Sequence, residues 1–260
     1  MTTPADSSVD SKQRFSSRVD AYVAARPSYP REILAHLRDA IGFSPSWQVV
    51  DVGSGTGISC ALFLDNGNAV TGVEPNAAMR AAAEDSLRGF AAFHSVDGSA
   101  EATTLPDACA DLVVAAQAFH WFDPAAAGRE ARRILRAGGY ALLMWNDRLL
   151  GGSPFLEAYE RLLVDFGTDY LKVRHNNIAD AHLAAFFGAG GWRTATFPNH
   201  QHLDFAGVRA RVLSSSYMPQ QGDPRYEPML ARLHDIFDRH NQDHRVTIEY
   251  RTQLFYGQLG

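Results

Sequence analysis

The chain has 260 residues, of which 46% are hydrophobic and 20% are charged, so it can bury a full core. Its formal net charge is −5, and it has no basic run, which argues against a protein whose main role is to coat nucleic acid. The two cysteines have no paired spacing, no apolar stretch is long enough to span a membrane, and residues 1–4 show no signal-peptide pattern. We therefore expect a soluble, cytoplasmic protein that binds neither membrane nor nucleic acid.

The N-terminal part is predicted to be a tail followed by helices. Residues 1–13 are small, polar and rich in serine, which is typical of a disordered tail. Helices are predicted over residues 16–25 and 31–41, where apolar side chains recur at helical spacing. The apolar face of the second helix consists of Ile33, Leu34, Leu37 and Ile41.

Short apolar runs alternate with helical segments in the next part of the chain. This alternation is typical of a parallel sheet that is covered by helices on both faces. Asp123 and Pro124 start one of the helices, because an N-cap acceptor is followed there by a ring that suits the first helical position. The pattern predicts an α/β fold. Its strands are expected at residues 47–52, 69–74, 92–96, 112–116 and 140–145.

The alternation becomes weaker after residue 146. Helices are predicted from Ser153-Pro154 to about residue 166, over residues 181–189, and from Asp223-Pro224 to about residue 240. Strands are predicted over residues 192–197 and 246–255.

A glycine-rich turn at the end of the first apolar run is the most informative motif. Residues 49–57 read VVDVGSGTG, and Glu74 ends the next apolar run, seventeen residues after Gly57. Alternate glycines let the backbone pass close under a ligand at the carboxyl end of a parallel strand. The Glu74 carboxylate can then accept hydrogen bonds from two ribose hydroxyls. The motif indicates an adenosine-type cofactor, with glycines that serve backbone geometry alone as the alternative.

Two details distinguish the candidate cofactors. A dinucleotide fold has the pattern G-x-G-x-x-G, and the position of its third glycine is here Ile58. Asp51 places a carboxylate inside an apolar strand, where it needs amide donors or a cation nearby. The missing third glycine argues against a nicotinamide dinucleotide.

The turn D-x-G-x-G-x-G resembles the first motif of class I S-adenosylmethionine-dependent methyltransferases. Residues 97–117 resemble the adenine-contacting loop and fourth strand of this family, and residues 135–140 resemble its turn before the fifth strand. The resemblance covers roughly residues 14–147 and is to the small-molecule branch called methyltransferase type 11, which includes trans-aconitate-like and ubiquinone-biosynthesis-like enzymes. Ser99 and Ala137 depart from the pattern, because many members have an acid and a proline there.

The resemblance implies a Rossmann-like, mostly parallel seven-stranded sheet with helices on both faces and an antiparallel last strand beside the fifth. It implies one methyltransferase domain over residues 14–260. Residues 14–43 would form lid helices, and residues 44–147 would form the cofactor-binding core. Residues 148–190 and 206–242 would be insertions that cap the substrate site.

The resemblance also implies which residues contact S-adenosylmethionine. Arg26 would pair with the methionine carboxylate, and Tyr22 would close the methyl pocket. The expected cofactor-binding residues are Tyr22, Arg26, Asp51, Gly53, Ser54, Gly55, Thr56, Gly57, Glu74, Pro75, Met79, Ser99, Ala100, Glu101, Ala116 and Gln117.

The aromatic segment 117–122 follows the fourth strand, where the resemblance places the transferable methyl group. Aromatic faces can stabilise a sulfonium cation by about 0.5–2 kcal/mol per contact. His120 could take a proton from the acceptor, or it could bind a backbone carbonyl while its aromatic neighbours pack. Arg209 and Arg211 are further candidates for holding an acidic substrate. The expected substrate pocket contains Tyr29, His120, Trp121, Arg148 and Tyr217.

These observations predict a methyltransferase that uses S-adenosylmethionine to methylate a small molecule, with oxygen favoured over nitrogen or carbon as the acceptor atom, as a monomer or homodimer. A nicotinamide-dependent oxidoreductase and a non-catalytic cofactor-binding protein are the alternatives. No metal is expected, since the histidine pairs 200/202 and 240/244 have chelating spacing but no clear third ligand.

Overall fold

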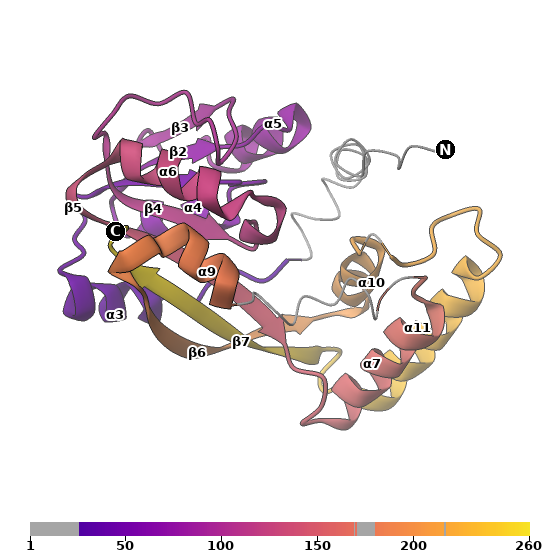
Figure 1. The fold of residues 1–260 in the computed structure, drawn as a ribbon. Coiled ribbons are helices and arrows are strands. Elements are labelled where there is room, and N and C mark those ends of the chain that lie inside the picture. The colour runs from indigo at the N-terminus through magenta and orange to yellow at the C-terminus, as the bar shows by residue number, and fades with distance from the viewer. Residues whose placement is uncertain (1–25, 169, 171–179, 216) are drawn as a thin grey trace, which may run out of the picture. The chain divides into compact units, whose positions relative to one another are not determined.

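The computed structural model describes residues 26–168, 170, 180–215 and 217–260. The predicted tail, the helix over residues 16–25 and Tyr22 lie outside this part of the chain. A seven-stranded sheet has the order β3-β2-β1-β4-β5-β7-β6 (Figure 1). The neighbours from β3 to β5 pair in parallel, and the last strands are antiparallel. The predicted fold, with the final strand beside the fifth, is therefore confirmed.

Helices and strands alternate along most of the described chain (Figure 1). The strands are β1 (Gln48–Val52), β2 (Ala69–Val73), β3 (Phe93–Val96), β4 (Ala110–Ala116), β5 (Leu135–Arg148), β6 (Arg193–Leu203) and β7 (Val246–Gly257). The α-helices are α3 (Glu32–Ile41), α4 (Ile58–Asp65), α5 (Ala77–Ser86), α6 (Pro124–Ile134), α7 (Pro154–Phe166), α9 (Asp180–Phe187), α10 (Phe205–Leu213) and α11 (Tyr226–His240). The 3₁₀ helices are η1 (Phe119–Trp121) and η2 (Gly188–Gly190).

Most predicted elements are present, with differences at their ends. β5 begins at Leu135, not near residue 140, because Leu135 pairs with Ala110 before the register shifts. α11 begins at Tyr226, since Asp223 forms a local turn in which its Oδ1 accepts the backbone N–H of Arg225 at 2.8 Å. α10 was not predicted.

The predicted helix caps are present. The side chain of Asp123 accepts the backbone N–H of Ala126 at the start of α6, and Pro124 occupies the first helical position. Ser153 caps α7 in the same way, through the N–H of Leu156. Both helix starts could be predicted from the sequence because a cap of this kind involves only residues that are close together in the chain.

Adjacent residues of the central strands point to opposite faces of the sheet and into different apolar clusters. On β4, Leu112 and Val114 belong to one cluster, and Val113 and Ala115 belong to the other. Helices α3 and α4 supply the first cluster, whereas α6 and α9 supply the second. This burial on both faces explains why the strands are continuous apolar runs. The predicted apolar face of α3 is confirmed, since Ile33 and Leu37 are buried and Leu34 and Ile41 are half-buried against the first cluster.

The chain divides into two compact units. The first unit comprises Ser28–Asn146, Asn177–Pro198 and Arg251–Gly260. The second unit includes Asp147–Asn176 and Asn199–Tyr250, and its own core is formed by α7, α10, α11 and the start of β7. The predicted insertion over residues 148–190 is thus divided between the units, because α9 belongs to the first.

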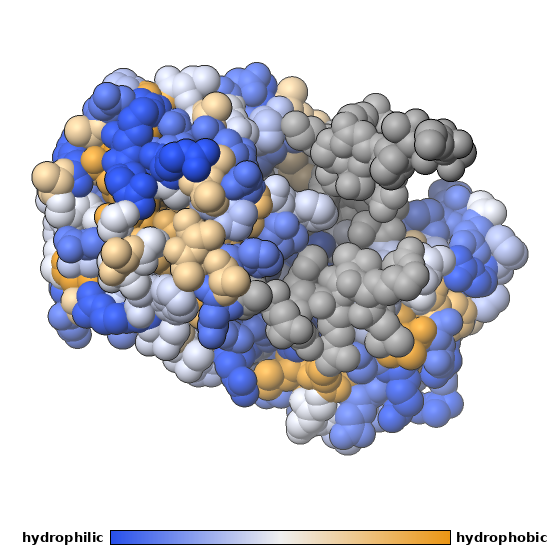
Figure 2. Space-filling view, viewed as in Figure 1, coloured by the Kyte–Doolittle hydropathy of each residue, from blue (hydrophilic) through white to orange (hydrophobic). Residues whose placement is uncertain are grey.

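The face seen in Figure 2 is mostly hydrophilic, with smaller apolar areas. In the described part of the chain, the large hydrophobic side chains that stand exposed are Trp121, Leu150 and Val164. None of the described helices is long and apolar enough to cross a membrane.

Candidate active site

The candidate site lies in the first unit, at the carboxyl ends of the central parallel strands. The strand order reverses between β1 and β4, and open α/β sheets bind ligands in the crevice beside such a reversal. Gly53 follows β1 there, and its N–H donates to the carbonyl of Val73 on β2 at 2.8 Å. Gln117 follows β4 at the same edge. The sheet topology therefore gathers residues that are far apart in the sequence.

The three glycines of the turn are not equivalent. All three have positive φ: 67° at Gly53, 55° at Gly55 and 83° at Gly57. A Cβ on Gly53 would meet the Ala118 side chain at 2.7 Å, and a Cβ on Gly57 would meet the Leu87 side chain at 2.6 Å. A Cβ on Gly55 would meet no atom of the described residues within 4 Å. Two glycines therefore allow close packing inside the protein, and Gly55 is the one that faces open space.

The carboxylate of Glu74 is held beside this open glycine. Its two oxygens accept the backbone N–H of Gly55 at 3.1 Å and the N–H of Asn76 at 2.9 Å. The Asn76 side chain in turn caps α5 by accepting the N–H groups of Ala78 and Met79. These contacts fix the orientation of a half-buried carboxylate at the end of β2. An acceptor held beside an open glycine is suited to binding the hydroxyls of a ribose.

Asp51 is fully buried beneath the turn. Its Oδ2 accepts the hydroxyl of Ser59 at 2.5 Å and the thiol of Cys60 at 3.3 Å. The expectation of amide donors or a cation was wrong, because the first turn of α4 brings a hydroxyl and a thiol to the carboxylate instead. Burial raises the pKa of Asp51 to about 6, although these two hydrogen bonds oppose the rise. Asp51 Oδ1 and Thr56 Oγ1 are enclosed polar atoms without a hydrogen-bond partner.

The predicted adenine-contacting loop is well ordered by local contacts. Ser99 and Ala102 exchange backbone hydrogen bonds at 3.1 and 3.2 Å, and Ala100 is buried between them. Glu101 has a structural task, since its carboxylate accepts the N–H of Asp123 at 3.0 Å before α6. This contact ties the loop after β3 to the loop after β4.

The end of β4 carries backbone strain. Gln117 has φ 57°, which is uncommon for a residue other than glycine, and strained residues of this kind cluster at functional sites. Its N–H donates to the carbonyl of Met144 at 2.9 Å, and its side-chain amide donates to the carbonyl of Asn146 at 3.1 Å. These contacts join the ends of β4 and β5.

Asn146 is a site residue that the sequence analysis missed. Its side chain donates to the carbonyl of Ser28 at 3.2 Å and accepts the hydroxyl of Thr252 at 2.5 Å. Asn146 thereby connects β5, β7 and the segment before α3. An amide directly after the apolar run 140–145 was the available signal, but its partners are more than 100 residues away in the sequence.

The aromatic segment after β4 has both packed and exposed members. Phe119 is buried against Phe122, Trp145 and Phe186. His120 and Trp121 are exposed, and their ring centroids lie 4.6 Å apart. The structure therefore assigns Phe119 to the core and leaves the next two side chains at the surface of the first unit.

The remaining predicted site residues are divided between the units. Tyr29 is buried in the apolar cluster of α3, and Met79 is buried on α5. Arg26, Arg148 and Tyr217 belong to the second unit. In the first unit, Ser54 is a buried residue of the turn, Pro75 follows Glu74 and is exposed, and Ala116 ends β4 and is half-buried.

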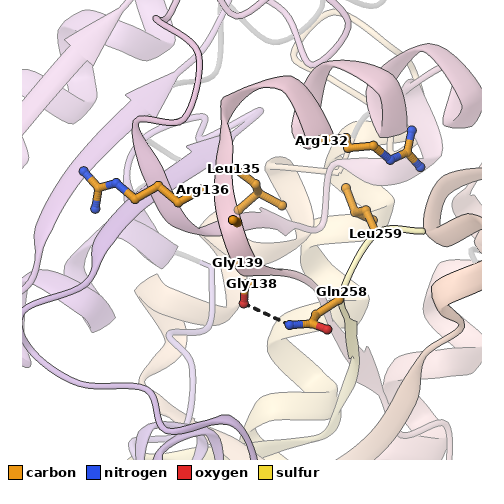
Figure 3. Close-up of a pocket in the computed structure, with 8 residues that line it drawn as sticks. Arg132, Leu135, Arg136, Gly138, Gly139, Gln258 and Leu259 are labelled. Carbon is orange, nitrogen blue, oxygen red and sulfur yellow. Dashed lines mark hydrogen bonds between the residues drawn. The ribbon is translucent and has the colours of Figure 1, made fainter.

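A pocket of about 260 Å³ lies elsewhere in the first unit, at the start of β5 (Figure 3). The side-chain amide of Gln258 donates to the carbonyl of Gly138 at 3.0 Å across it. Arg132 and Arg136 point in opposite directions there (Figure 3), and Arg136 is paired with Asp111. No charged groups converge in this pocket. It also lies at the start of β5, whereas the candidate site lies at the carboxyl ends of the parallel strands, so this pocket is not the candidate site.

Comparison with known proteins identifies the part of the chain that carries this geometry. Residues 50–143, which include the glycine turn, Glu74 and Gln117, match the family described as methyltransferase domain. This segment resembles a methyltransferase domain. The predicted resemblance to class I S-adenosylmethionine-dependent methyltransferases is confirmed, and the small-molecule branch stays a prediction.

Several curated relatives of the chain are described as methyltransferases. An uncharacterized methyltransferase of Mycobacterium tuberculosis is 38% identical over 139 residues, which are 54% of each chain. The chain thus spans about half the length of the first curated relatives that it matches. An uncharacterized methyltransferase-like protein of Schizosaccharomyces pombe is 27% identical over 251 residues, or 93% of each chain.

Solved structures show a similar fold. The YcgJ protein of Bacillus subtilis has a TM-score of 0.55 at 19% identity, over 89% of this chain and 100% of its own. The [4+2]-cyclase SpnF has a TM-score of 0.56 at 17% identity, over 99% of both chains. At these identities the likeness concerns the fold alone.

Proposed function

We propose that the protein transfers the methyl group of S-adenosylmethionine to a small-molecule acceptor, with oxygen as the acceptor atom. The observation that carries the proposal is Gly55, which faces open space beside the fixed carboxylate of Glu74 within the segment that resembles a methyltransferase domain. The residues present fit the cofactor, because an open glycine and an oriented acceptor are what an adenosine group requires.

Each group of the turn has a separate task in this proposal. Glu74 would bind the ribose hydroxyls, and Gly55 would allow the backbone to approach the cofactor. Asp51, held by Ser59 and Cys60, supports the turn from below. Ser99 and Ala100 would lie against the adenine. Pro75 and Met79 would flank it, while Arg26 and Tyr22 would act at the methionine end.

The bound cofactor supplies an electrophilic methyl group on a sulfonium leaving group. The protein must then align the acceptor and exclude water, and such ordering alone is worth about 7–11 kcal/mol. Gln117 and Asn146 would keep the ends of β4 and β5 in place during this step. His120 would accept the proton if the acceptor is a hydroxyl, and Trp121 would provide an aromatic wall.

The fold by itself does not decide the reaction, because a [4+2]-cyclase shares it. A cofactor-binding protein without methyl transfer is therefore the second candidate. Calorimetric titration with S-adenosylhomocysteine and with NADH tests the cofactor, and a metabolite panel with labelled S-adenosylmethionine tests transfer. Binding of NADH alone would overturn the proposal. Binding of S-adenosylhomocysteine without any methylated product would favour the second candidate.

We propose further that the acceptor is the chief partner and that the protein works in the cytoplasm without nucleic acid or membrane. Its acidic net charge of −5 supports this, since like charge repels phosphate backbones and anionic lipids.

A further inference from the structure

Arg211 is surrounded by tyrosines in the second unit. It lies in the last turn of α10 and is half-buried. Its Nε donates to the hydroxyl of Tyr250 at 3.4 Å, and that hydroxyl donates to Oε1 of Gln201 at 2.7 Å. Tyr159 and Tyr250 belong to the same buried cluster of the second unit, and Tyr217 packs against this cluster. Tyr250 therefore positions Arg211 through a hydrogen bond, while the other rings shape its surroundings.

No carboxylate pairs with Arg211 anywhere in the described chain. The neighbouring Arg148 differs, since it binds Glu160 and the hydroxyl of Tyr170, the latter at 2.8 Å. Glu160 thus neutralises Arg148, and the charge of Arg211 is left without a counterion among these side chains. A guanidinium has five N–H donors, of which one is used here, so most of its hydrogen-bonding capacity is available.

The hydroxyl of Tyr159 adds a second available donor. Tyr159 is 2% exposed, and burial raises its pKa to about 12, so the hydroxyl stays protonated at neutral pH. Within the part of the chain that the structure describes, this hydroxyl has no hydrogen-bond partner. It is not among the enclosed atoms that lack a partner, which means that it reaches accessible space. A deeply placed polar group with such an opening is suited to meet a ligand, because an unpaired buried hydroxyl is unfavourable.

We propose that Arg211 and Tyr159 form a binding site for the carboxylate of a small organic acid, with Tyr250 as the positioning residue. One uncompensated positive charge and one neutral donor match a single carboxylate, and the planar guanidinium can bind its two oxygens in parallel. A phosphate dianion would require a second cation, and Arg148 is already paired with Glu160. That this acid is also the methyl acceptor rests on the proposed function.

The test compares the wild-type protein with Arg211→Met, Tyr159→Phe and the control Arg209→Met. Arg209 lies on the same helix, but it is exposed and donates to Tyr226 at 3.1 Å. Benzoate and succinate are the probes, benzamide and succinamide are their neutral counterparts, and inorganic phosphate is the competing anion. Thermal shift and calorimetry are measured at constant ionic strength, with and without S-adenosylhomocysteine.

We expect at least one carboxylate to raise the melting temperature of the wild type and of Arg209→Met, whereas its amide does not. Arg211→Met should weaken binding at least about tenfold, because a charge-assisted pair is lost. Tyr159→Phe should weaken it less. The proposal is overturned if neither carboxylate binds the wild type, if phosphate binds better than both, or if Arg211→Met binds normally.

Should Arg211→Met fail to fold, Tyr159→Phe decides, since unchanged carboxylate affinity in that variant would also overturn the site. Titration with S-adenosylhomocysteine separates this result from the proposed function. Carboxylate binding without cofactor binding would remove the methyltransferase proposal and keep the site. Cofactor binding without carboxylate binding would remove the carboxylate site and keep the methyltransferase proposal.

Discussion

Replacing Glu74 tests the placement of the cofactor most directly. In Glu74→Ala, the ribose would lose two hydrogen bonds to a charged acceptor, each worth about 1.5–3 kcal/mol before water replaces part of it. The N–H groups of Gly55 and Asn76 would also lose their acceptor, which loosens the turn. We expect the affinity for S-adenosylhomocysteine to fall at least tenfold, or by about 1.4 kcal/mol, in calorimetric titration.

Glu74→Gln refines the same test. A glutamine carbonyl can accept only one of the two backbone N–H groups, and its NH₂ group would face the other donor. We therefore expect Glu74→Gln to lose affinity as well, but less than Glu74→Ala. Glu84→Gln is the matched control, because Glu84 is an exposed acid on α5. Unchanged affinity in Glu74→Ala, with an unchanged melting temperature, would refute the placement of the ribose beside Glu74.

Three further predictions concern the same unit. Gly55→Val should abolish binding of S-adenosylhomocysteine, because the side chain enters the open space above the turn and the residue has φ 55°; normal binding in calorimetry would show that the cofactor lies elsewhere. His120→Ala should lower turnover about a hundredfold or more with little change in cofactor affinity if the histidine accepts the proton; intact turnover and a flat pH profile would leave it as a pocket wall. The pKa of Asp51 is raised from 3.8 to about 6. At a pH between these two values, Asp51 is therefore protonated in the folded state and ionised in the unfolded state. This side chain therefore lowers stability as pH rises from 4 to 6, so the stability difference between Asp51→Asn and the wild type should shift by roughly 2 kcal/mol in favour of the variant over that range. Urea unfolding at several pH values measures this, and parallel pH profiles would contradict it.

The sequence predicted those features that depend on residues close together in the chain. The glycine turn, Glu74 and the capped starts of α6 and α7 were all readable from local patterns. The start of β5 was not, because Leu135 becomes a strand residue only by pairing with Ala110.

Site contacts between distant residues were also beyond the sequence. The partners of Asn146 include Ser28 and Thr252, which nothing local connects to it. Arg211 and Tyr250 are 39 residues apart, and only the tertiary fold shows that a tyrosine, and not a carboxylate, binds this arginine. Composition can suggest an arginine for an acidic ligand, but it cannot show which arginine lacks a counterion.

The difference between the three glycines also predicts how the chain tolerates random substitution. At Gly53 and Gly57 a new side chain collides with Ala118 or Leu87, so variants should be lost through misfolding. At Gly55 no atom of the described residues lies within 4 Å of a new Cβ, and residues that accept positive φ, such as asparagine, should give folded protein that no longer binds cofactor. A library scored separately for protein abundance and for activity would then distinguish the three positions. Substitutions at Gly55 should lower activity while abundance is kept, and substitutions at Gly53 and Gly57 should lower abundance.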